Sequence, residues 1–195
     1  VVFDTVESVD LEADPKVIRM AYGTIIAKSV IIATGARPAK LGLDAEEKLL
    51  GAGVSYCATC DGNFFKDKDV CVVGGGDTAA ADAIYLSRIC SKVSVIVRRN
   101  VLRATAIYNL KLQELDNVEI IWNTIVTDLV EDNGAVAGVK LLNRETEEES
   151  ELACSAMFVA VGTTPNTELF AGRLELDSTG RILTNSVGRT GIPGV

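Results

Sequence analysis

The sequence contains no histidine among its 195 residues. This absence excludes Ser-His-Asp and Cys-His catalysis, and it excludes any zinc site that needs imidazole ligands. A reaction that moves a proton near neutral pH must therefore use a carboxylate, a thiol or a lysine.

Long apolar runs are also absent. The longest, such as residues 30–33 and 157–161, are too short to span a bilayer, and no basic start precedes an apolar signal core. The net charge of −8 argues against nucleic acid or an anionic membrane as the main partner. We therefore expect a cytoplasmic protein with neither nucleic-acid nor membrane partners.

Cysteine is sparse, with five residues of which only Cys57 and Cys60 form a close pair. An odd number with one tight pair is not the pattern of a secreted disulfide framework. Cys71 falls in an expected core strand, Cys90 on the core face of an expected helix, and Cys154 at the start of the last strand. These three are interpreted as small buried hydrophobic residues.

The pair itself lies in the run Cys57-Ala58-Thr59-Cys60-Asp61. Zinc needs four ligands, and neither a second Cys pair nor a histidine is available, so no metal site is expected. A redox disulfide needs only these two residues, and the short loop lets the sulfurs join with little motion. Asp61 is the candidate that donates or accepts the proton, although it could also serve only as a turn residue.

A glycine-rich turn follows the dithiol. Residues 69–73 are expected to form a strand, 77–90 a helix and 92–97 a second strand, so that Gly74-x-Gly76-x-x-Ala79 fits the dinucleotide pattern G-x-G-x-x-G/A. Gly74 would allow the tight turn, Gly76 the approach of a pyrophosphate, and Ala79 close packing of helix on strand. The sequence therefore predicts dinucleotide binding.

The start of that helix would attract phosphates through its free N–H groups, and Asp77 or Thr78 is expected to cap it. The predicted cofactor-binding residues of this loop are Gly74, Gly75, Gly76, Asp77, Thr78 and Ala79.

Three arginines indicate which dinucleotide binds. NAD sites place an acid after the second strand, on the ribose 2′-hydroxyl, whereas this chain has Arg98, Arg99 and Arg103 there. Guanidinium groups bind a 2′-phosphate, often in a bidentate manner, so the cluster favours NADP(H). The alternative is a solubilising surface cluster.

The fold class expected is α/β, a Rossmann-like three-layer nucleotide-binding domain with a parallel sheet and an antiparallel β-meander. Residues 1–34 are expected to be strands, including a start at residues 1–3 and a buried strand at 29–35. The other expected elements are a helix at 105–115, strands at 118–122 and 155–161, and antiparallel strands over 125–152. Linkers are expected at 35–43 and 162–166. The ends of the chain suggest an internal piece of a longer protein.

These motifs resemble those of low-molecular-weight thioredoxin reductases of the bacterial and plant type. Cys57-Ala58-Thr59-Cys60-Asp61-Gly62 is similar to the family's redox motif, and the glycine turn and arginines are similar to its NADPH site. Residues 33–36 and 161–167 resemble the two crossovers between its FAD and NADPH domains, which adds Thr34, Gly35 and Gly162 to the predicted cofactor-binding residues.

The resemblance implies that NADPH reduces FAD, FAD reduces the Cys57–Cys60 disulfide, and the dithiol reduces thioredoxin. Cys60 would face the flavin, Cys57 would attack the partner, and Asp61 would act as the acid. Residues 1–36 and 161–195 would belong to a partial FAD domain and 37–160 to the NADPH domain, within a homodimer whose NADPH domain swings. The family's FAD-binding loops fall outside residues 1–195, and Val97 stands where the family often has histidine.

Two alternatives remain. The flavoprotein component of an alkyl hydroperoxide reductase shares the architecture, but it would be expected to use NADH and to lack the pair Arg98-Arg99. A nucleotide-binding redox sensor or zinc-binding module without turnover belongs to a different class.

Overall fold

The computed structural model describes all residues, 1–195, and they divide into two compact units. The central unit comprises residues 38–162, and the flanking unit comprises residues 1–37 with 163–195. No helix in either unit has the length and apolar character needed to cross a bilayer.

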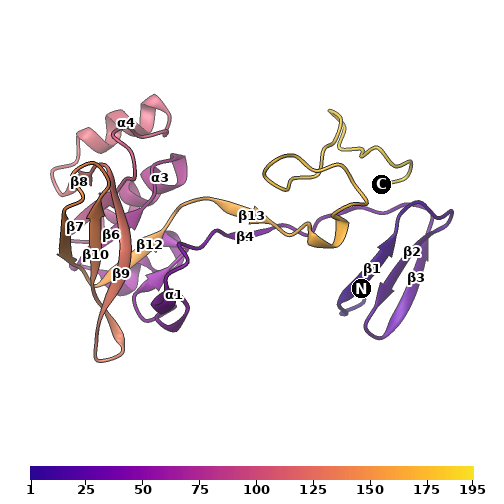
Figure 1. Cartoon of the computed structure of the whole chain (residues 1–195), viewed down its shortest axis with the longest axis horizontal. Helices are drawn as coiled ribbons and strands as arrows, with labels where there is room; N and C mark the ends of the chain where they lie inside the picture. The colour runs from indigo at the N-terminus through magenta and orange to yellow at the C-terminus, as the bar shows by residue number, and fades with distance from the viewer. The chain divides into compact units, whose positions relative to one another are not determined.

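A five-stranded parallel sheet forms the middle of the central unit, with strand order β5-β12-β6-β7-β8 (Figure 1). Its strands are β5 (Val54–Ser55), β6 (Asp69–Val73), β7 (Lys92–Ile96), β8 (Val118–Ile121) and β12 (Ala156–Val159). These strands are rich in β-branched residues without polar alternation because both faces of the sheet are covered. The predicted β-α-β unit is confirmed as β6, α3 (Asp77–Leu86) and β7.

Alternate residues of each strand enter two separate cores, as the two-residue period of a strand requires. On one face, Val72 and Val95 pack with Ala83 and Leu86 of α3, and α4 (Ala106–Gln113) extends this layer. On the other face, Cys71 and its neighbours pack against an antiparallel meander. The meander consists of β9 (Thr124–Asp132), β10 (Ala135–Asn143) and β11 (Glu149–Ala153). The expected three-layer α/β fold is confirmed.

The helix after the glycine turn ends at Leu86, short of the predicted end near Cys90. Asn117, which is distant in sequence, donates from Nδ2 to the carbonyl oxygens of Ser87 (2.8 Å) and Cys90 (3.2 Å). Asn117 thus satisfies two carbonyls that follow the end of the helix and have no partner within it. Three short helical elements of the central unit were not predicted from the sequence: α1 (Asp44–Lys48), α2 (Ala58–Asp61) and the 3-10 helix Gly62–Phe65.

The flanking unit contains the predicted antiparallel meander, which runs in the order β1-β2-β3. Its strands are β1 (Val6–Asp10), β2 (Lys16–Met20) and β3 (Gly23–Ala27), and a 3-10 helix spans Glu168–Phe170. A small core joins Val9 and Leu11 to Phe170 and Leu174, so the two ends of the chain fold together.

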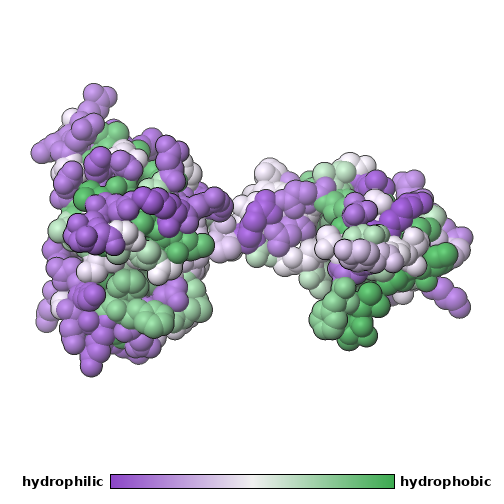
Figure 2. Space-filling view, turned by 90° about the horizontal axis from the view of Figure 1, so that it is seen from below, coloured by the Kyte–Doolittle hydropathy of each residue, from purple (hydrophilic) through white to green (hydrophobic).

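Two expected strands of this unit do not form. Residues 29–34 are irregular, Ile31 is 93% exposed, and the N–H of Val30 bonds to the carbonyl of Gly194 instead of a strand. Residues 1–3 are also outside any strand, because β1 begins at Val6. A β-branched run becomes a strand only when neighbouring strands pair with it, and none of the described strands does so. Figure 2 shows apolar surface on this unit, whose exposed large apolar residues include Phe3, Ile26 and Ile31.

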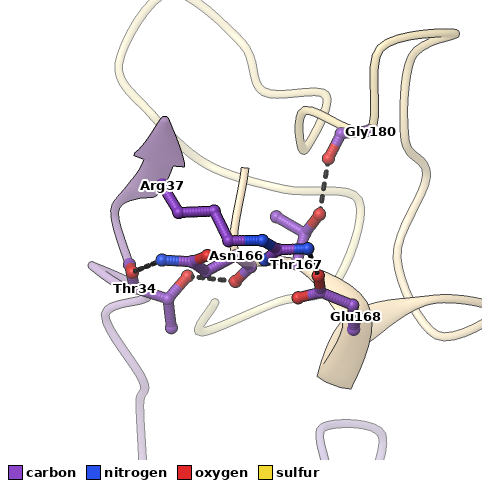
Figure 3. Close-up of polar contacts among 6 residues, drawn as sticks. All are labelled: Thr34, Arg37, Asn166, Thr167, Glu168 and Gly180. Carbon is purple, nitrogen blue, oxygen red and sulfur yellow. Dashed lines mark hydrogen bonds and ion pairs between the residues drawn. The ribbon is translucent and has the colours of Figure 1, made fainter. Parts of the chain in front are cut away.

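The two linkers are short paired strands, β4 (Ala36–Pro38) and β13 (Thr163–Pro165). Arg37 donates from Nη1 to Asn166 Oδ1 at 2.8 Å, and its Nη2 lies 2.5 Å from Glu168 Oε1 (Figure 3). Asn166 in turn donates from Nδ2 to the carbonyl of Thr34 at 3.0 Å. These hydrogen bonds and the ion pair join residues 34–37 to residues 166–168 within the flanking unit.

Candidate nucleotide and dithiol sites

A cavity of about 440 Å³ opens in the central unit where β6 and β7 end. The carboxyl ends of parallel strands are where open α/β sheets bind ligands. Its lining includes Gly74 and Gly75 from the turn after β6, and Arg98, Arg99 and Arg103 from the segment after β7. The structure thus brings five of the predicted cofactor-binding residues together.

The three glycines of the turn differ in what surrounds them. A Cβ on Gly74, whose φ is +151°, would lie 2.3 Å from the carbonyl oxygen of Ala160 and 2.9 Å from Cβ of Ala79. Gly74 therefore lets β6, β12 and α3 approach one another. Gly76 has open space where its Cβ would be. That space lies at the start of α3, whose first N–H groups have no intrahelical acceptors and could hold a pyrophosphate.

The expected side-chain cap of α3 is wrong. Gly76 is the N-cap residue, and no side chain caps the helix. Asp77 accepts instead from the backbone N–H of Thr105 at 2.7 Å, next to the start of α4. Thr78 is exposed and Ala79 is fully buried. The Asp77 carboxylate, which local capping rules would place on the N–H groups of α3, therefore makes a tertiary hydrogen bond instead.

The arginine segment is joined to the glycine turn through the backbone. The N–H of Arg103 donates to the carbonyl of Gly75 at 2.7 Å. Arg98, Arg99 and Arg103 are all exposed, and none takes part in the ion pairs of the chain. Their uncompensated positive charge beside the cavity makes this edge suitable for an anionic group.

The dithiol of the central unit is oxidised, with Cys57 and Cys60 joined by a disulfide. Cys57 is the N-cap of α2 and is half-buried, whereas Cys60 is exposed. The backbone N–H of Cys60 lies 3.2 Å from Cys57 Sγ and donates to it. When the disulfide is reduced, this donor would stabilise a thiolate on Cys57.

Ser55 is a functional candidate that the sequence analysis missed. It is only 3% exposed, and its hydroxyl donates to Asp61 Oδ2 at 2.6 Å while accepting from the N–H of Cys57 at 3.0 Å. One buried hydroxyl thus joins the predicted proton-transfer residue to the redox loop. Ser55 lies in the two-residue strand β5, which is too short to leave a periodic pattern in the sequence.

Glu46 is a second residue without a sequence signal. It is 1% exposed, and its carboxylate accepts from the N–H groups of Leu41 and Gly42 and from the Tyr56 hydroxyl at 2.7 Å. Burial alone raises the pKa of Glu46, but these hydrogen bonds outweigh it and hold the pKa below its usual value. Leu41 lines the cavity and Tyr56 precedes Cys57, so Glu46 fixes both segments.

The remaining cysteines are buried, as predicted. Cys71 and Cys154 bring their sulfurs to 3.7 Å in the core beneath the meander. Burial raises the pKa of Cys90 to about 11, with the carboxylates of Asp67 and Asp69 adding to the shift. No group of three or more Cys, Asp or Glu side chains is arranged to hold a metal ion.

None of the three residues predicted from the crossovers is among those that line the cavity. Thr34 donates from Oγ1 to the carbonyl of Asn166 at 2.7 Å, and Gly35 accepts from the N–H of Asn166 at 3.0 Å, both within the flanking unit. Gly162 ends the central unit, where its carbonyl accepts from the N–H of Ala39 at 2.9 Å.

Comparisons with known proteins agree with this geometry. The chain matches the family model described as pyridine nucleotide-disulphide oxidoreductase over residues 2–195. It is 43% identical to a thioredoxin reductase of Rickettsia conorii over 199 residues, covering 100% of this chain and 64% of the relative. It is 42% identical to a thioredoxin reductase of Streptomyces coelicolor, covering 98% of this chain and 60% of the relative.

Solved structures give the same result. The crystal structure of Lactococcus lactis thioredoxin reductase in its FR conformation matches with a TM-score of 0.90 at 35% identity, covering 99% of this chain and 64% of that chain. The thioredoxin reductase of T. acidophilum matches with a TM-score of 0.88 at 34% identity, covering 98% and 63%. The chain thus spans less than two thirds of each of these relatives, and the predicted resemblance is confirmed. Because the match extends from residue 2 to residue 195, this chain belongs to the pyridine nucleotide-disulphide oxidoreductase family.

Proposed function

We propose that this chain carries the NADPH site and the redox dithiol of a flavoprotein disulfide reductase whose partner is thioredoxin or a thioredoxin-like protein. The observation that carries the proposal is that the central unit holds both an arginine-bordered cavity and the Cys57–Cys60 disulfide. The first is suited to a two-electron carrier, and the second is a two-electron acceptor. The name thioredoxin reductase, given to the relatives, supports the choice of partner.

NADP(H) is the nucleotide that the cavity suits. The open space at Gly76 would admit the pyrophosphate to the start of α3, and Arg98, Arg99 and Arg103 would bind the 2′-phosphate. No carboxylate lines the cavity to receive a ribose 2′-hydroxyl, as NAD sites require. This favours NADP(H) over the NADH expected of an alkyl hydroperoxide reductase component.

The dithiol would work by thiol–disulfide exchange. Reduction of the Cys57–Cys60 disulfide takes up two electrons and two protons, and the resulting dithiol returns them when it reduces a partner disulfide. In this proposal Cys57 attacks the partner as a thiolate, aided by the N–H of Cys60. Cys60 then displaces the partner, while Asp61, held by Ser55, supplies the proton to the leaving thiolate.

In this proposal FAD binds to the whole protein, and residues 1–195 do not by themselves form its binding site. The flanking unit contains no strand–turn–helix of the kind that binds a pyrophosphate, so residues 1–195 alone do not fit FAD. In the whole protein FAD would supply the two-electron link between nicotinamide and disulfide. We assign residues 1–36 and 161–195 to its FAD domain and 37–160 to its NADPH domain, with Thr34, Gly35 and Gly162 at the crossovers. The whole protein would be a cytoplasmic homodimer.

The test uses the 195-residue chain itself. The chain is first reduced with dithiothreitol, and the reagent is then removed. The reduced chain should reduce one equivalent of oxidised thioredoxin, which is measured by alkylating the free thiols and counting them by mass spectrometry. Cys57→Ser and Cys60→Ser should each abolish this transfer, whereas Cys90→Ser should leave it unchanged. A double Cys57/Cys60 variant that transferred electrons as well as the unmodified chain would refute the assignment.

A further inference from the structure

The geometry points to Arg144 as a fourth guanidinium of the 2′-phosphate site, one that helps to select NADP(H) over NAD(H). This inference rests on the proposed function, because it assumes that the cavity binds a nicotinamide dinucleotide. Arg144 follows β10, at the start of the turn toward β11, and it is distant in sequence from Arg98 and Arg99.

Two hydrogen bonds of Arg144 and one of Asn123 hold Arg144 beside the arginine segment. Its backbone N–H donates to the carbonyl of Asn123 at 2.6 Å, and the N–H of Asn123 donates to the carbonyl of Arg99 at 3.1 Å. The guanidinium also contacts the arginine segment, since Arg144 Nη1 donates to the carbonyl of Arg98 at 3.4 Å. Backbone and side chain therefore both place Arg144 next to the two arginines already assigned to the phosphate.

The pairing of β9 with β10 places the end of β10, and with it Arg144, near the cavity. Asn143, the last residue of β10, pairs with Thr124, the first residue of β9. Thr124 lines the cavity, and its N–H donates to the carbonyl of Val97, the residue that follows β7. Arg144 itself does not line the cavity; it follows Asn143, whose partner on β9 does, and it lies at the edge where the arginines are exposed.

The guanidinium of Arg144 forms no ion pair within the chain. Arg144 is also exposed. The adjacent carboxylate of Glu145 instead accepts from Asn123 Nδ2 at 2.7 Å. A guanidinium has five N–H donors, so the single contact to Arg98 leaves donors free for a phosphate.

The grouping is unexpected for a chain with 27 acidic and 19 basic residues. Arg98, Arg99, Arg103 and Arg144 repel one another, and no carboxylate of the chain offsets this repulsion by an ion pair. A phosphate dianion would relieve the repulsion. Because the cluster follows the second strand of the β-α-β unit, the phosphate in question is the one on the ribose 2′-oxygen.

The experiment compares cofactor affinities of the 195-residue chain by isothermal titration calorimetry with NADP⁺ and NAD⁺. Arg144→Gln should weaken NADP⁺ binding by about fivefold, as expected for loss of one exposed charge-assisted contact, with NAD⁺ affinity changed less than about twofold. Arg88→Gln is the matched control, because Arg88 is likewise exposed and outside every ion pair but has no hydrogen bond to the segment of Arg98 and Arg99. Arg144→Lys should recover part of the NADP⁺ affinity.

Adenosine 2′,5′-bisphosphate and 5′-AMP serve as a second pair of probes. Arg144→Gln should weaken binding of the bisphosphate more than binding of 5′-AMP, and this difference should shrink at high salt. An Arg144→Gln chain that retained the wild-type preference for NADP⁺ would overturn the inference and leave the proposed function intact. Equal weakening of NADP⁺ and NAD⁺ would also overturn it, because that result indicates a structural role. A wild-type chain without preference for NADP⁺ would refute both this inference and the cofactor assignment.

Discussion

The hydroxyl of Ser55 donates a 2.6 Å hydrogen bond to Asp61 Oδ2 and also accepts one from the N–H of Cys57. This buried contact links the carboxylate to the first cysteine of the disulfide. It gives Asp61 a fixed position relative to the sulfurs, which proton transfer to a leaving thiolate requires.

Ser55→Ala is therefore expected to slow electron transfer from the reduced chain to oxidised thioredoxin by about tenfold. It should also lower the free energy of unfolding by about 1–2 kcal/mol, because the N–H of Cys57 and the Asp61 carboxylate lose a buried partner. The measurements are stopped-flow exchange kinetics and urea unfolding. Ser55→Thr, which keeps the hydroxyl, should restore most of the rate, and Ser91→Ala is the exposed control. An unchanged rate in Ser55→Ala would remove Ser55 from the mechanism.

Gly74 and Gly76 should respond differently to the same substitution. Gly74→Ala places a Cβ 2.3 Å from the Ala160 carbonyl at a left-handed φ, so we expect a loss of at least about 3 kcal/mol in unfolding free energy. Gly76→Ala meets no atom of the chain and should fold normally, but it should weaken NADP⁺ binding by filling the pyrophosphate space. Circular dichroism and calorimetry measure the two effects. A stable Gly74→Ala chain would contradict the packing role.

Replacing both Arg98 and Arg99 by Gln should lower the affinity for NADP⁺ by at least about tenfold, while the affinity for NAD⁺ changes little. The physical reason is that only NADP⁺ presents a 2′-phosphate to these guanidinium groups. Titration calorimetry of both cofactors provides the readout, with Arg88→Gln as the control for loss of an exposed arginine elsewhere on the chain. Equal losses for the two cofactors would remove the specificity argument.

Asp82 on α3 should make stability depend on pH. Burial raises its pKa from 3.8 to about 6, so between these values the folded chain holds a proton that the unfolded chain has released. The stability contributed by protonated Asp82 is therefore lost as the pH rises from about 4 to about 6. Above that range the buried carboxylate is charged, and its full destabilising effect on the free energy of unfolding is present. Asp82→Asn should raise the melting temperature at pH 8 and leave it unchanged at pH 3.5. An equal gain at both pH values would exclude titration of Asp82 as the cause.

The sequence by itself determined the elements whose rules are local. The β-α-β unit follows from Gly74-Gly75-Gly76 between a β-branched run and a helical stretch. The β9–β10 hairpin follows from Asn133-Gly134, whose φ values of 51° and 80° suit the turn that such pairs favour. The Cys57–Cys60 disulfide and the arginines after β7 are also readable from spacing alone.

Tertiary structure decided what depends on partners distant in the chain. It left residues 29–34 without a strand, because their β-branched side chains have no paired neighbours among the described strands. Contacts across the fold satisfy the Ser87 carbonyl after α3 and hold the Asp77 carboxylate on the N–H of Thr105 instead of at the helix N-terminus. They also brought Arg144 to Arg98, across 46 positions of sequence. Local propensity specifies turns and periodic elements, whereas a lone buried hydroxyl or an exposed guanidinium acquires its role only from what the fold places beside it.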